Sequence, residues 1–351
     1  MEIINFIQDE ATPHNNILIK NVLDNCDMKL WYAVKKSKQY NWNVDLNNEI
    51  IESEIYGTKL NFRLLKYFLA KHKVEKFLMV GWSNSTTRVL FILAVFFRLN
   101  LFMWFDLPDE KKERGWLKIK LRKIFYFLLK NSKIQLFCAG KNTVEYFILN
   151  GFNKNRLHNL PIQVEVVKYK KFNSRTKYLK IFAGSRLTFD KGFDLLIAAL
   201  GQLERNCNIK LNLAGEGPEL NNLKSQSKYL NIADKIEFLG WISPLEYQNQ
   251  LSNCDVFIHP ARKDAYGATV LALASGTPVI GSNCAGAVND CLIEGENGFS
   301  YSPESVDDLM LLILRFYEDC SLIKAMSDKA LYIANQYDGK YWAKKLVEVM
   351  K

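Results

Sequence analysis

The chain has 351 residues, of which 48% are hydrophobic and 24% charged, and it carries a formal net charge of +10 at pH 7. This balance is that of a folded globular protein and excludes an intrinsically disordered or fibrous chain. The length exceeds what one hydrophobic core usually organises, so two domains are expected.

Seven cysteines are scattered along the chain, and no two of them form a C-x-x-C pair. An odd number without paired spacing disfavours a disulfide framework and a zinc site, and a reducing compartment fits best. The first residues, M-E-I-I-N-F-I-Q-D-E, lack the basic flank and the long apolar run of a secretion signal. We therefore expect a cytoplasmic location.

The first half of the chain alternates apolar runs with helical patterns, which predicts a doubly wound parallel α/β sheet. Strands are expected at residues 3–7, 29–34, 76–80, 101–105 and 134–138, and helices at residues 15–24, 59–71 and 143–150. The first turn, Q-D-E-A-T-P-H-N-N, contains no glycine, so the dinucleotide fingerprint G-x-G-x-x-G is absent. A dinucleotide-dependent dehydrogenase is therefore disfavoured.

A basic amphipathic segment begins at Lys111 and ends at Lys133. Its cations alternate with large apolar side chains, a pattern typical of a helix that lies on an anionic membrane surface. A domain helix with a solvated basic face explains the pattern equally well, since every surface helix needs an apolar stripe toward its core. Nucleic acid is the weakest interpretation, because no zinc-finger spacing or RNA-binding aromatic motif is present.

The second half begins after Leu160-Pro161 and a polar, basic run at residues 168–177, which predict a linker. Strand and turn then recur, with strands expected at residues 178–183, 209–214, 235–239 and 256–258, a helix at 269–274 and a strand from Pro278. An open parallel sheet collects its ligand at the carboxyl ends of its strands. The recurring turns therefore predict one site built by several loops.

The loop before the helix at 269–274 has the features of an anion site. Tyr266, Gly267, Ala268 and Thr269 present backbone N–H groups at the start of a helix, where the helix dipole is positive. Gly267 also lets the backbone approach a ligand closely. The expected ligand is a phosphate.

Four ordered motifs resemble retaining glycosyltransferases of family 4. They are G-S-R-L-T-F-D-K-G at 184–192, A-G-E-G-P at 214–218, F-L-G-W at 238–241 and the stretch from Asp264 to G-T-P-V at 276–279. The resemblance covers about residues 178–300 and implies the GT-B fold, in which two Rossmann-like doubly wound α/β domains face a central cleft. It implies an acceptor-binding domain at residues 1–170, a nucleotide-sugar donor domain at 171–335 and a final helix at 336–351 that packs back on the first domain.

The resemblance also assigns site residues. The family positions that match Arg186 and Lys191 hold the donor diphosphate and neutralise the charge of the leaving phosphate, and Asp264 matches a carboxylate that contacts sugar hydroxyls. These three are the expected catalytic residues. The expected donor contacts are Gly184, Glu216, Trp241, Ile242, Tyr266, Gly267, Ala268, Thr269 and Val270.

Simpler interpretations exist for several of these residues. Arg186 and Lys191 could each be surface cations, Asp264 a loop cap, Glu216 a solvent-facing turn residue and Trp241 part of the core. His259, at the end of an apolar strand before a proline, is expected to be a hydrogen-bonded core histidine rather than a catalytic one.

The chain departs from the family pattern on the helix after Asp264. Family members place a second carboxylate eight residues further on, where it holds the ribose, whereas this helix reads V-L-A-L-A-S-G, is one residue shorter and carries no carboxylate before Asp290. A catalytically impaired GT-B scaffold that binds a glycan or a partner protein is therefore the alternative function. On the acceptor side, Asp106 ends the strand in W-F-D-L-P and is the candidate residue, with a helix cap as its simpler role.

The resemblance implies a retaining glycosyltransferase that uses a UDP-sugar, or in second place a GDP-sugar. Its expected acceptor is a glycan or a lipid-linked glycan in bacterial cell-surface polysaccharide or lipopolysaccharide synthesis, at the inner face of the cytoplasmic membrane. No D-x-D triplet is present, so neither a cofactor nor a metal is expected, and Arg186 and Lys191 would neutralise the diphosphate.

Overall fold

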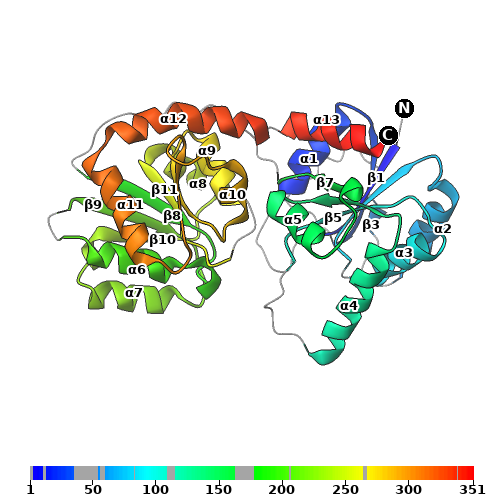
Figure 1. The fold of residues 1–351 in the computed structure, drawn as a ribbon, viewed down its shortest axis with the longest axis horizontal. Coiled ribbons are helices and arrows are strands. Elements are labelled where there is room, and N and C mark those ends of the chain that lie inside the picture. Colours follow the sequence, from blue (N-terminus) through cyan, green and yellow to red (C-terminus); the bar gives the residue numbers. More distant parts are fainter. Residues whose placement is uncertain are drawn as a thin grey trace. The chain divides into compact units, whose positions relative to one another are not determined.

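The structure is a computed structural model that describes residues 3–10, 13–34, 54–55, 60–82, 84–108, 115–162, 178–204, 207–263, 267–337 and 339–351. The chain divides into two compact units (Figure 1). The first unit comprises residues 1–163 together with 339–351, and the second comprises residues 164–338.

The first unit is built on a parallel sheet with the strand order β3-β2-β1-β4-β5-β6-β7. Its strands are β1 (Ile3–Glu10), β2 (Asp27–Val34), β3 (Glu54–Ile55), β4 (Lys76–Val80), β5 (Phe102–Phe105), β6 (Gln135–Cys138) and β7 (Leu157–Asn159). The five strands predicted from the sequence are all present, so the doubly wound parallel sheet is confirmed. The sequence does not predict β3 and β7, because two or three residues are too short to show an apolar period.

Helices cover both faces of this sheet. One core cluster joins buried residues of α2 (Phe62–Lys71), α3 (Ser85–Phe96), α4 (Trp116–Lys130) and α5 (Lys141–Leu149) on one face. Another cluster on the opposite face joins α1 (Pro13–Leu23) with α13 (Gly339–Met350), which lie side by side in Figure 1. The last helix of the chain therefore completes the first unit.

The second unit has a six-stranded parallel sheet with the order β10-β9-β8-β11-β12-β13. Its strands are β8 (Leu179–Gly184), β9 (Ile209–Ala214), β10 (Ile236–Gly240), β11 (Val256–His259), β12 (Val279–Ser282) and β13 (Gly298–Tyr301). The strand order reverses between β8 and β11, which is the position where an open α/β sheet binds its ligand. The linker predicted at residues 168–177 lies outside the described residues.

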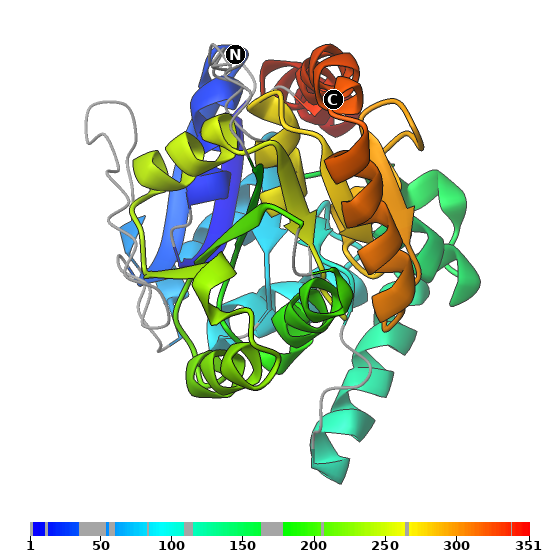
Figure 2. The ribbon, with the colours of Figure 1, turned by 90° about the vertical axis from the view of Figure 1, so that its left-hand side faces the viewer.

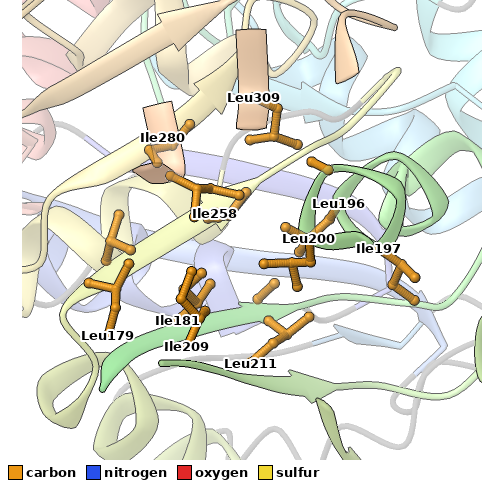
Figure 3. Close-up of a cluster of buried hydrophobic side chains, with 14 of the residues drawn as sticks. Leu179, Ile181, Leu196, Ile197, Leu200, Ile209, Leu211, Ile258, Ile280 and Leu309 are labelled. Carbon is orange, nitrogen blue, oxygen red and sulfur yellow. The ribbon is translucent and has the colours of Figure 1, made fainter. Parts of the chain in front are cut away.

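Helices also cover both faces of the second sheet. Contacts join α6 (Phe193–Gln202) with α7 (Leu220–Tyr229) and α11 (Val306–Glu318) on one face (Figure 2). On the other, α9 (Gly267–Ala274) contacts α8 (Pro244–Asn253), α10 (Gly286–Cys291) and α12 (Ser321–Ala334). Figure 3 shows the core, where Ile181 and Ile258 of the sheet meet Leu196 and Leu200 of α6. Each such fully buried aliphatic side chain contributes about 2 kcal/mol.

Among the described residues, no helix is long and apolar enough to cross a membrane.

Candidate functional site

The first loop of the site follows β8 and carries both predicted diphosphate cations. It leads from Gly184 into the short 3-10 helix Phe189–Lys191 and then into α6. Arg186 is exposed, whereas Lys191 is buried with 8% of its surface exposed, and its ammonium group lies 3.6 Å from Asp190 Oδ2. A buried lysine is uncommon because its charge loses water, so Lys191 is not the ordinary surface cation that the sequence left open.

Backbone hydrogen bonds join this loop to the loops after β9 and β10. Leu187 N donates to Glu216 O at 2.8 Å, and Gly215 N donates to Gly240 O at 2.7 Å. Gly215 has a φ of +131°, and a Cβ atom there would lie 1.8 Å from Ser185 O, so only glycine fits. The structure thereby brings three of the four sequence motifs together at one edge of the sheet.

The side chains on these loops are open to solvent. Glu216 is exposed, Ile242 is half-buried, and Trp241 has 61% of its surface exposed. The core interpretation of Trp241 is therefore wrong. An exposed aromatic ring beside a half-buried apolar residue can support the flat face of a nucleobase.

The fourth motif lies where β11 leads into α9, and Asp264 and Tyr266 fall outside the described residues. Gly267 and Ala268 are partly exposed in the first turn of α9, whereas Thr269 and Val270 are fully buried. Thr269 Oγ1 lies 2.8 Å from His259 Nδ1, and His259 is itself buried, which confirms it as a hydrogen-bonded core histidine. Neither Thr269 nor Val270 reaches the surface, and their role as donor contacts stays a prediction.

Helix α9 carries no carboxylate. Its last turns are buried at Ala272, Leu273 and Ala274, and Leu271 is the partly exposed residue between Val270 and this buried run. A side chain at position 271 is therefore the one in the second half of α9 that reaches the surface of the unit.

In the first unit, the predicted acceptor residue Asp106 comes directly after β5 and is accessible to solvent. Protein atoms around it nevertheless withdraw water, and this desolvation raises the pKa of its carboxyl group. A carboxylate with a raised pKa is a stronger base than an ordinary aspartate, because it binds a proton more tightly.

The first unit also contains a polar pair, Asp9 and Asn84, that was not predicted from the sequence. Asn84 Nδ2 donates to the Asp9 carboxylate, and Asn84 Oδ1 accepts from Thr87 N at 3.0 Å and caps α3. Asp9 lies near the end of β1 and Asn84 follows β4, the two strands between which the sheet order reverses. The sequence shows a carboxylate at the end of a predicted strand and the N-cap sequence N-S-T-T, but it does not show that the two residues are in contact.

Within the described ranges, no group of three or more His, Cys, Asp and Glu side chains is placed to hold a metal ion.

Residues 167–331 match the family model described as glycosyl transferases group 1. Alpha-monoglucosyldiacylglycerol synthase of Streptococcus pneumoniae is 31% identical over 137 residues, which are 34% of this chain and 31% of that protein. O-antigen biosynthesis glycosyltransferase WclY of Escherichia coli is 32% identical over 157 residues, which are 42% of this chain and 43% of that protein. The chain spans between 31% and 56% of the length of the first curated relatives that it matches.

The fold has a solved counterpart over its whole length. HepE of Anabaena in complex with UDP superposes with a TM-score of 0.79 and 18% identity, covering 100% of this chain and 99% of that one. Residues 167–331 are therefore similar to the glycosyl transferases group 1 family, and the chain has the GT-B fold of two Rossmann-like α/β units.

Proposed function

We propose that the protein is a retaining glycosyltransferase that moves a sugar from a nucleotide-sugar to a lipid-linked or glycan acceptor in bacterial cell-surface polysaccharide or lipopolysaccharide synthesis. One observation carries the proposal. Three loops converge at the carboxyl edge of the second sheet, and they bring the buried cation Lys191 to the place where such sheets bind ligands. Retention of anomeric configuration rests on the family 4 resemblance of these loops.

The proposed nucleotide-sugar donor is argued from the positive charges of the site. Breaking the bond to a nucleoside diphosphate leaves negative charge on phosphate oxygens, which fixed cations and a helix N-terminus stabilise. Lys191, Arg186 and the first turn of α9 supply these elements, so the reaction needs no metal ion. HepE, the structural counterpart, is known in complex with UDP and with UDP-glucose, which favours a UDP-sugar over a GDP-sugar for this chain.

The proposed lipid-linked acceptor is argued from the exposed surface of the first unit. Helix α4 buries Phe125 and Leu129 in the core and packs Tyr126 and Leu128 against it, but six other large apolar residues are exposed. These exposed residues are Trp116, Leu117, Ile119, Leu121, Ile124 and Phe127. The plain domain helix considered from the sequence would bury such a stripe, and here it is left in solvent among lysines.

Helices α2 and α3 pack on the same core cluster as α4, and they also leave aromatic rings in solvent. Phe62, Phe96 and Phe97 are exposed, and none of the three helices contains a carboxylate. Three described helices that carry exposed aromatic rings and cations but no carboxylate match an anionic lipid bilayer, so the proposed location is the inner face of the cytoplasmic membrane. The relative from Streptococcus pneumoniae is named for a glycosylated diacylglycerol, which favours a lipid acceptor.

The second candidate is a GT-B scaffold that binds a glycan or a partner protein without turnover. The absence of a carboxylate on α9 favours it, because the ribose then lacks the partner that family members provide. The two candidates differ in whether purified protein consumes a nucleotide-sugar.

A two-stage experiment tests the proposal. Thermal unfolding is first followed with UDP, GDP, ADP and CMP and with their sugars, since a ligand that binds the native state raises the unfolding temperature. The selected sugar nucleotide is then incubated with the protein, and release of the nucleoside diphosphate is measured with and without lipid extract. Stabilisation with release supports the enzyme, and stabilisation without release in either case supports the scaffold. No response to any nucleotide would overturn the donor site.

A further inference from the structure

Arg262 lies two residues before Asp264 in sequence and has 13% of its side chain exposed. Its guanidinium group forms a two-pronged pair with Asp194 in the first turn of α6, with N···O distances of 2.6 and 2.7 Å. It also donates from Nε to Glu304 Oε1 at 2.6 Å, in the turn between β13 and α11. Arg262 therefore joins the loop after β11 to the first turn of α6 and to the turn after β13.

The turn that carries Lys191 is held by the same side chain. Arg262 Nη1 donates to Phe189 O at 2.9 Å, and the guanidinium carbon lies 4.0 Å from the centre of the Phe189 ring. Beside it, Lys263 N donates to Asp190 O at 3.0 Å. The loop after β11 thus contacts residues that precede Lys191 in the chain and, through Asp194, a residue that follows it.

Close packing makes this arrangement rigid. A Cβ atom on Gly192, which follows Lys191, would lie 2.0 Å from Pro260 O, so the turn rests directly on the backbone at the end of β11. Glu304, the other partner of Arg262, has a φ of +66°, a conformation that a non-glycine residue holds only when its surroundings fix it. The paired carboxylates raise the pKa of Arg262, so its charge is permanent.

We propose that Arg262 is a positioning residue of the donor site, which holds the Lys191 turn in the geometry that binds the diphosphate. The proposal rests on the proposed function, because it assigns Lys191 to a diphosphate. Two-pronged arginine pairs fix orientation as well as distance, which a lysine cannot do. Loss of Arg262 should therefore weaken binding of the charged part of the donor and leave the nucleoside part unaffected.

The test compares UDP with uridine, which carries no phosphate, by calorimetry and ligand-observed NMR. Arg262→Gln should weaken UDP binding about tenfold, Arg262→Lys should weaken it by less, and uridine binding should change less than about twofold in both. In a Lys191→Ala background, Arg262→Gln should cost no more than about a further twofold, because the residue it positions is gone. Lys329→Gln, which breaks the exposed 2.8 Å pair with Glu296 in the same unit, is the matched control and should bind UDP as the wild type does.

The outcomes separate the two proposals. If wild-type protein binds UDP and Arg262→Gln binds it equally well, or loses UDP and uridine in equal proportion, the positioning role is overturned while the donor site stands. An additive loss in the Lys191→Ala background would equally overturn it, because Arg262 would then act independently of Lys191. If wild-type protein binds neither UDP nor GDP, the proposed function and this inference fail together.

Discussion

A hydrogen bond of 2.8 Å joins His259 Nδ1 to Thr269 Oγ1 and ties the end of β11 to the first turn of α9. Both residues are buried, so water cannot replace the bond when one partner is removed. Thr269→Val keeps the side-chain shape but removes the hydroxyl group, and it should lower the free energy of unfolding by about 1 to 3 kcal/mol. Urea unfolding measures the loss, and Thr269→Ser, which retains the hydroxyl, should recover most of it. A valine variant as stable as wild type would show that this bond contributes nothing net.

Lys191 is buried and Arg186 is exposed, so replacing each by alanine should lower the activity by a different amount. Lys191→Ala removes a buried cation and should cost about 2 to 5 kcal/mol of transition-state stabilisation, as for one partner of a buried charge contact. Arg186→Ala removes an exposed cation and should lower kcat/KM about tenfold. Nucleotide-sugar consumption by the purified variants measures both effects. Lys228→Ala removes an exposed cation on α7 and is the control. Wild-type kcat/KM in both the Lys191 and the Arg186 variants would mean that these residues do not bind the diphosphate.

Most strands of both sheets are predictable from the sequence, because each of them is an apolar run between turn residues. Strand β13, Gly298–Tyr301, is not predicted, because its four residues mix glycine, serine and aromatic side chains and do not form an apolar run. The four motifs of the second unit could also be found, since each is local in sequence. Their convergence follows from the parallel order of β8, β9, β10 and β11.

Other parts of the site depend on contacts between distant residues and leave no local signal. Asn84 and Asp9 are separated by 75 positions, and Arg262 and Asp194 by 68. The burial of Lys191 likewise comes from the packing of its turn and not from the neighbouring residue types, which include a charged Asp190. Single-sequence patterns report local period and turn chemistry, so they could not have revealed these three features.

The cysteines provide a test of burial. Cys284 is exposed, Cys320 is half-buried and the other five are buried, with no disulfide among the seven. A thiol reagent at pH 8 should therefore modify Cys284 rapidly, and Cys284→Ser should abolish this fast phase. Rapid modification of more than two thiols in folded protein would contradict the described packing.

Burial also raises the pKa of the Cys138 thiol to about 12. An unfolded thiol ionises near pH 8.5, so the raised value in the folded state gives a stability contribution that is complete below about pH 8.5 and is lost as the pH rises toward 12. The urea midpoint of wild-type protein should therefore fall between pH 8.5 and 10.5, and Cys138→Ala should show a smaller fall. An equal pH dependence in both proteins would exclude Cys138 as its source.

The lipid surface proposed for α4 predicts charge-dependent binding. Lys118, Lys120 and Lys123 are exposed on α4, and each surface cation contributes about 1 kcal/mol to binding an anionic bilayer. Changing all three to glutamine should release the protein from sedimented vesicles of mixed neutral and acidic phospholipid, and salt should weaken wild-type binding. The matched control changes Lys210, Lys224 and Lys228, three exposed lysines of the second unit, which alters the net charge equally.

Two outcomes would count against this surface. If the control triple variant is released as readily as the α4 variant, net charge and not α4 attracts the vesicles. If wild-type protein does not sediment with acidic vesicles at low salt, the exposed aromatic residues of α4 have another partner. Trp116→Ser tests the apolar part. It should weaken binding without changing the salt dependence, because it removes exposed apolar area that the bilayer would bury and removes no charge.

Helix α9 gives the last prediction, which concerns the missing ribose partner. Inserting a glutamate between Leu271 and Ala272 would restore the family spacing after Asp264. The insertion would also rotate the residues on one side of it by about 100° and displace a buried face, because Ala272, Leu273 and Ala274 pack in the core. Leu271 is partly exposed, so Leu271→Glu places a carboxylate on the helix without disturbing that face.

A hydrogen bond to a charged acceptor contributes roughly 1.5 to 3 kcal/mol, so Leu271→Glu should tighten UDP binding about tenfold or more. Leu271→Gln is the matched control, with nearly the same shape and no charge, and should give a smaller gain. Calorimetry with UDP and with 2′,3′-dideoxy-UDP identifies the cause, since the gain should vanish when the ribose hydroxyls are removed. Tight binding of UDP by wild-type protein, with no gain in the glutamate variant, would mean that another residue already holds the ribose, and Asn289 and Asp290 on α10 would be the next to test.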